Sequence, residues 1–140
     1  MKRLFALFSL FALSLAAAGA AFAVNPTETI RLKAAGSPVS GTVTAGASGA
    51  GTRVVFRLRG LPAGSRVRAV FQAGTCRAVG ASFASAGSGT ANAAGVAAWT
   101  SSILFHASPV SWSTAADGGH VIEIVVGGKV VACGVIPGMS

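Results

Sequence analysis

Few side chains in this chain of 140 residues could carry catalysis or hold a metal. Its histidines, cysteines and carboxylates together are His106, His120, Cys76, Cys133, Glu28, Asp117 and Glu123. With three carboxylates in all, acid–base chemistry between a pair of them has few candidates. Serine, histidine and aspartate all occur, but no nucleophile-elbow motif or other triad signature accompanies them. The sequence therefore predicts no catalytic residue.

Asp117, His120 and Glu123 lie close enough in the sequence to suggest a metal site. Successive side chains of a strand point to opposite faces, so a strand that begins at His120 separates its imidazole from Glu123. We interpret Asp117 as part of an Asp-Gly turn and Glu123 as the partner of an arginine. No cofactor is expected on this interpretation, and a metal at His106 or His120 stays an open alternative.

Residues 1–23 have the features of a cleaved signal peptide. Met1, Lys2 and Arg3 make a short positive start, an uncharged apolar run follows, and Ala21-Phe22-Ala23 supplies a cleavage site before Val24. The apolar run is shorter than the ~20 residues that a membrane-spanning helix needs. We expect an exported protein, periplasmic or secreted, whose mature chain 24–140 forms a single domain without a transmembrane segment.

The composition is typical of a chain that buries most of itself. Charged residues make up 10% of the sequence and apolar residues 52%, which excludes a disordered polyelectrolyte. Eleven basic residues oppose three acidic ones, so the formal net charge is +8. We expect a folded domain with a basic surface.

The two cysteines predict a disulfide, because an even count in an oxidising compartment favours pairing. Closing the long loop between Cys76 and Cys133 would remove roughly 4 kcal/mol of unfolded-state freedom. Two buried free thiols are the alternative.

The mature sequence alternates apolar and polar residues in short runs between clusters of Gly, Pro, Ser and Asn, which is typical of an antiparallel β-sandwich. A turn-rich connection is expected at 86–95 and a long loop at 102–119, while Gly127-Gly128 predicts a tight hairpin. Trp99 and Trp112 are interpreted as core or loop-packing residues. The strands expected from the pattern are 29–34, 38–45, 52–59, 65–72, 81–84, 95–101, 120–126 and 129–136.

Four segments resemble the Cu/Zn superoxide dismutase family. The most specific is KVVACGVIPG, similar to the family's last strand; SPVSGTVTA, TRVVFRLRGLPAG and GTANAAGVAAW follow the same order as earlier strands and turns. The resemblance covers residues 27–137. It implies an all-β, eight-stranded Greek-key flattened barrel and a disulfide between Cys76 and Cys133.

The metal ligands of that family are absent from the corresponding positions of this sequence. The copper-binding H-x-H pair of the fourth strand corresponds here to Val70 and Gln72, and a later copper histidine falls around Val125 or Val126. The arginine that guides superoxide corresponds to Val130, and the expected zinc loop contains neither His nor Asp. The resemblance therefore implies the fold without a functional metal site.

Arginines are the most conspicuous charged feature of the chain. If the strands on either side of GLPAG form a hairpin, their outward arginines lie opposite one another, with one more just beyond. Such a patch would attract an anionic surface or an acidic protein, whereas a merely solvated face is the alternative. Nucleic acid is not expected as a partner, because no aromatic residues are interleaved with the arginines for base stacking. The patch comprises Arg53, Arg57, Arg59, Arg66, Arg68 and Arg77.

Three hypotheses on function follow from the sequence. The first is an exported, superoxide-dismutase-like β-sandwich protein with a structural or binding role and no catalysis. The second is a copper/zinc metalloprotein of the same family with atypical ligands. The third is a protein that binds anionic surfaces or polymers through its arginines.

Overall fold

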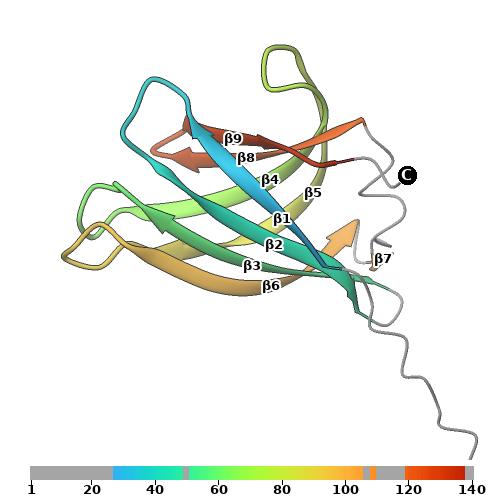
Figure 1. Ribbon diagram of the computed structural model, residues 1–140, viewed down its shortest axis with the longest axis horizontal. Coiled ribbons are helices and arrows are strands. Elements are labelled where there is room, and N and C mark those ends of the chain that lie inside the picture. The colour runs from blue at the N-terminus through green and yellow to red at the C-terminus, as the bar shows by residue number, and fades with distance from the viewer. Residues whose placement is uncertain (1–26, 49–50, 106–107, 110–118, 138–140) are drawn as a thin grey trace, which may run out of the picture.

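A computed structural model describes residues 27–48, 51–105, 108–109 and 119–137 of the chain (Figure 1). The expected leader 1–23, His106, Trp112 and Asp117 lie outside these ranges. Every regular element within them is a strand, and they include no helix that could cross a membrane. The strands are β1 (Thr27–Ala34), β2 (Ser40–Ser48), β3 (Gly51–Arg59), β4 (Arg66–Gly74), β5 (Val79–Thr90), β6 (Ala97–Phe105), β7 (Ser108–Pro109), β8 (His120–Val126) and β9 (Lys129–Val135).

The strands form one curled antiparallel sheet in the order β3-β2-β1-β9-β8-β4-β5-β6-β7. β6 also pairs with β3, so the sheet bends back towards its first strand. Figure 1 shows the result as two layers, β1, β2, β3 and β6 on one side and β9, β8, β4 and β5 on the other. The all-β prediction is confirmed as a curled half-barrel.

The core lies between the two layers, and β3 and β4 contribute to it by alternation of buried and outward side chains, whereas residues His120–Val125 of β8 are all buried. On β3, Val54, Phe56 and Leu58 are buried while Arg53, Arg57 and Arg59 are exposed. On β4, Val67 and Phe71 are likewise buried against the opposite layer. Burial of one apolar face fixes the register, because a slip of one residue would turn that whole face to water.

Two connections differ from the sequence-based expectation. β5 extends from Val79 to Thr90, so residues 86–90 are strand and not the expected turn. β6 continues to Phe105, and Ser108–Pro109 forms a short β7, inside the stretch expected to be a loop. β5 is hard to recognise in the sequence because its Gly and Ser residues give little alternation of apolar and polar side chains.

The β8–β9 hairpin follows the prediction. Gly127 and Gly128 connect the strands with φ angles of 57° and 78°. Both values lie in the left-handed region that the tight hairpin turn requires and that glycine adopts without a steric penalty.

Candidate functional site

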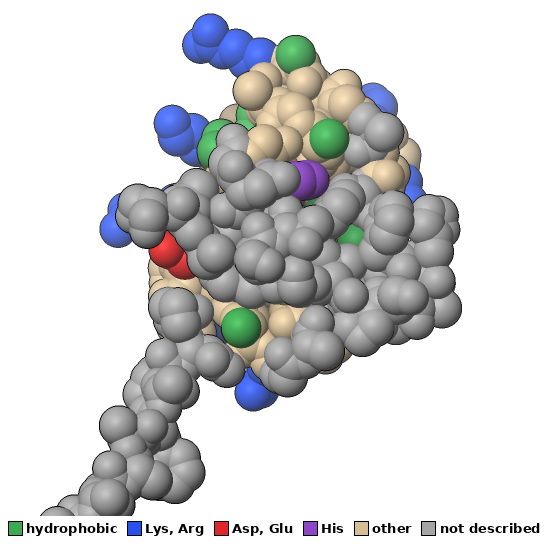
Figure 2. Space-filling view, turned by 90° about the vertical axis from the view of Figure 1, so that its right-hand side faces the viewer, with side chains coloured by type: hydrophobic (Ala, Val, Ile, Leu, Met, Phe, Trp, Pro, Cys, Tyr) green, Lys and Arg blue, Asp and Glu red, His purple; other side chains and the backbone are tan. Residues whose placement is uncertain are grey.

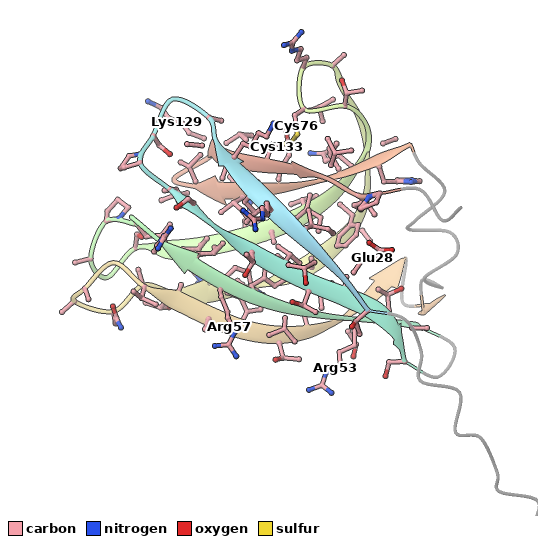
Figure 3. All side chains as sticks on the ribbon, in the orientation of Figure 1. Glu28, Arg53, Arg57, Cys76, Lys129 and Cys133 are labelled. Atoms are coloured by element: carbon pink, nitrogen blue, oxygen red, sulfur yellow. A yellow bond between two sulfur atoms is a disulfide. The ribbon has the colours of Figure 1, made fainter. Side chains whose placement is uncertain are left out.

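The disulfide joins the loop after β4 to the last strand. Cys76 and Cys133 are bonded, with their Cα atoms 5.9 Å apart, which confirms the predicted pair (Figure 3). Cys133 lies opposite Glu123 in the β8–β9 ladder. Side chains directly opposite in a ladder share a face, so the disulfide stands beside the Glu123 carboxylate on the outer face of β8 and β9.

The positions that correspond to metal ligands in the resemblance meet on this same outer face. They border a cavity of about 410 Å³ between β4, β5, β8 and β9. No imidazole lines it, and the described part of the chain contains no cluster of three or more metal-ligating side chains. Valine has no lone pair, and copper prefers imidazole to an amide, so the residues present do not fit the family's metals. The cavity is lined by Arg68, Val70, Gln72, Ser82, Ser85, Glu123, Val125, Gly128 and Val130.

Glu123 is the buried charge of this cavity, with only 6% of the residue exposed. Its Oε2 accepts a hydrogen bond of 2.9 Å from the Gln72 amide. The expectation that Glu123 pairs with an arginine is wrong for the described residues. In the β4–β8 ladder Glu123 is opposite Val70, with Arg68 and Gln72 as its two diagonal neighbours, and the amide is the one that bonds the carboxylate.

His120 does not join Glu123 in a common site. The residue is buried at the start of β8, and its backbone carbonyl accepts a hydrogen bond from the Ile136 amide. It shares the alternation of the core residues Ile122 and Ile124, whereas Glu123 lines the outer cavity. The predicted separation of His120 from Glu123 is confirmed.

The predicted arginine hairpin is wrong. β3 pairs with β2 and β6, whereas β4 pairs with β5 and β8, so the GLPAG connection crosses from one layer to the other. Arg53, Arg57 and Arg59 therefore belong to one outer face and Arg66 and Arg68 to the opposite one. A short connection looks like a hairpin in the sequence, but the pairing partners are set by strands far along the chain.

The outer face of β1, β2 and β3 carries a cationic groove of about 610 Å³. The register places Arg31 opposite Thr42 and Thr42 opposite Arg57, so two arginines flank a small residue of the central strand. Arg59 adds a third guanidinium, whose Nε donates a 3.2 Å hydrogen bond to the Ser40 hydroxyl. The long arginine side chains of β1 and β3 thus form the walls of the groove, and the small residues of β2 form its floor. We call Arg31, Arg57 and Arg59, together with the β2 floor at 40–42, the arginine groove.

Sequence reasoning missed Arg31 as part of this groove. The alternation of apolar and polar residues along 29–34 already indicates that the Arg31 side chain points outward. Only the register of β1, β2 and β3 shows that it lies beside Arg57. Figure 3 shows Arg53 and Arg57 pointing away from the strands.

The remaining arginines are spread over other surfaces. Arg66 and Arg68 are exposed on β4, and Arg77 is exposed beside the disulfide. Among the described residues none of the arginines of the chain forms an ion pair. Figure 2, which is turned by 90° from Figure 1, shows Lys and Arg side chains around the rim of the molecule.

No protein-family model and no curated protein matches the chain.

Proposed function

We propose that this chain is an exported, superoxide-dismutase-like Greek-key protein whose role is binding and not dismutation. Two observations support the fold part of the proposal. The order β8-β4-β5-β6 is that of a Greek key, since β4, β5 and β6 are consecutive and, after the two-residue β7, β8 returns to lie beside β4. The disulfide joins the two cysteines that the resemblance pairs.

The absence of dismutase activity follows from the residue types on the outer face of β4 and β8. Val70, Gln72 and Val125, which the resemblance aligns with the copper ligands, line the cavity on this face. Copper that cycles between oxidation states would need imidazole ligands there.

A dismutase assay on purified mature protein, loaded with equimolar copper and zinc and then freed of unbound metal, tests this part. We expect no superoxide dismutation above that of a blank without protein. Free Cu²⁺ at the same concentration serves as the positive control. Stoichiometric retention of copper with a rate well above that of the aquo ion would contradict the proposal and favour the atypical metalloprotein.

The ligand class that the arginine groove supports best is an acidic polysaccharide. Three guanidiniums without a carboxylate partner among the described residues attract carboxylate or sulfate groups and can bind them through paired hydrogen bonds. Hydroxyls of Thr29, Ser40 and Thr42 line the same groove and match the hydroxyls of a sugar. This combination of guanidinium and hydroxyl groups is the observation that carries the proposal.

Other polyanions fit this face less well. Its outward positions on β3 and β6 include Val55, Ala98 and Thr100, and the side chains that the structure describes on this face include no aromatic ring on which a base could stack. Among the described residues that line the groove, Val96 is the one exposed large apolar side chain, which is too little to enter a lipid layer.

Retention on immobilised heparin, a sulfated polysaccharide, tests the groove. We expect the wild type to be retained at low salt and released as salt rises, because screening weakens contacts between exposed charges. The variant Arg31→Gln/Arg57→Gln/Arg59→Gln should elute without retention. The matched control Arg66→Gln/Arg77→Gln/Lys129→Gln removes the same charge from other surfaces and should elute near the wild type. If both variants lose retention equally, binding follows net charge and the groove has no specific role.

A further inference from the structure

The cavity between β4, β5, β8 and β9 holds two opposite charges that do not satisfy each other. The Glu123 carboxylate is almost fully buried, and burying a carboxylate is costly unless it is well hydrogen-bonded. Its Oε2 accepts a hydrogen bond from the Gln72 amide, and its Oε1 is not among the buried, unpartnered atoms of the described residues, so this oxygen is open to the cavity. A donor supplied by a ligand would complete the set.

Arg68 lines the same cavity but makes no ion pair with Glu123 among the described residues. In the β4–β8 ladder Arg68 is opposite Val125 and Glu123 is opposite Val70. Such diagonal neighbours have Cα atoms about 7–8 Å apart, within reach of a long side chain. Because the guanidinium and the carboxylate nevertheless form no ion pair among the described residues, both charged groups can contact a small molecule in the cavity. A cation alone would meet the guanidinium, and an anion alone would meet the carboxylate.

The surface between the charges is apolar on one side and polar on the other. Val70, Val125 and Val130 form an aliphatic wall, and Ser82 and Ser85 add hydroxyls from β5. The volume of about 410 Å³ lies within the range of small-molecule sites. A calcium ion would need six to eight oxygen ligands, far more than one carboxylate provides.

We propose that this cavity binds a small zwitterion of the aliphatic α-amino acid class. The ligand ammonium donates to Glu123, its carboxylate accepts a paired contact from Arg68, and its side chain packs on the valines. The arginine groove lies on the opposite layer, so this site does not depend on polysaccharide binding.

Calorimetric titration of the oxidised mature protein with L-leucine tests the proposal. Two matched probes lack one charge each: 3-methylbutylamine has no carboxylate, and 4-methylpentanoate has no ammonium. We expect saturable binding of L-leucine with one site and at least tenfold weaker binding of each probe. No saturable heat with L-leucine would overturn the proposal, and so would an amine that binds as tightly as the amino acid.

Variants locate the site. Glu123→Gln keeps the shape and removes the charge, and Arg68→Gln removes the other charge; each should weaken L-leucine binding at least tenfold. Arg66→Gln, on the same strand but outside the cavity wall that contains Glu123, should bind like the wild type. If Glu123→Gln fails to fold, Glu123→Asp and Arg68→Gln still test the proposal. Glu123→Asp keeps the required negative charge, whereas Arg68→Gln removes the required positive charge. Unchanged binding in Arg68→Gln and a loss in Arg66→Gln would each contradict the assignment.

Discussion

At the scale of single residues, Trp99 connects β6 to both β3 and β5. Its ring stacks on Phe56 with centroids 4.4 Å apart and planes inclined by 12°, and its indole N–H donates to the Ala86 carbonyl at 3.1 Å. The hydrogen bond crosses from β6 to β5, where the ladder between these strands has a single described register pair, Ser85 with Leu104. Trp99 therefore fills the seam between the two layers.

Replacing Trp99 with alanine should reduce the free energy of unfolding by about 3–5 kcal/mol, the usual cost of removing a large packed aromatic. Trp99→Phe keeps the stack on Phe56 but loses the hydrogen bond to Ala86, so it should cost less than the alanine variant. Urea unfolding monitored by far-ultraviolet circular dichroism measures both. Equal losses in the two variants would mean that the stack contributes nothing.

At the scale of elements, the β8–β9 hairpin depends on the backbone freedom of its two glycines. An added Cβ at Gly127 would meet no atom within 4 Å, so the cost of Gly127→Ala lies in the positive φ alone. We expect a loss of about 1–2 kcal/mol in the free energy of unfolding. Gly127→Asn should cost less, because asparagine enters the left-handed region more readily. Urea midpoints of the two variants compare them directly, and an asparagine variant as unstable as the alanine one would argue against this turn geometry.

Sequence alternation was sufficient for strands that bury one clear apolar face and insufficient elsewhere. The expected strand 120–126 coincides with β8, and 52–59 differs from β3 by one residue, because both carry large aliphatic side chains. β5 was mostly missed, since its glycines are needed for close approach. A Cβ on Gly89 would lie 2.5 Å from the Trp99 ring, a requirement that appears only when the two strands are placed together.

The candidate sites were predictable only in part, for the same reason. The disulfide follows from residue type and count, with the resemblance as support. The contact between Gln72 and Glu123 joins residues 51 positions apart and needs the β4–β8 register. The arginine groove needs three strands in order, and local reasoning about GLPAG paired the wrong two.

At the scale of the whole molecule, one covalent bond closes a large part of the chain. Cys76 and Cys133 are 57 positions apart, and the loop between them contains all of β5, β6 and β8. In the chain-entropy model, a loop of this length restricts the unfolded state by about 4 kcal/mol. Among the described residues the β1–β9 ladder has two register pairs, and the Ala35 amide and Ser37 hydroxyl add hydrogen bonds to the Val131 carbonyl. The longer β8–β9 ladder and the disulfide also hold β9 in place.

The oxidised protein should therefore lose about 4 kcal/mol of unfolding free energy when the bond is removed. We expect the double variant Cys76→Ser/Cys133→Ser to unfold at a clearly lower urea concentration than the wild type. Adding a reductant should lower the midpoint of the wild type and leave that of the variant unchanged, which separates the bond from any packing effect of the serines. Intact mass of the untreated wild type should be two hydrogens below that of the reduced form. A wild-type midpoint insensitive to complete reduction would show that the disulfide adds no stability, and that strand pairing and core packing suffice to hold β9.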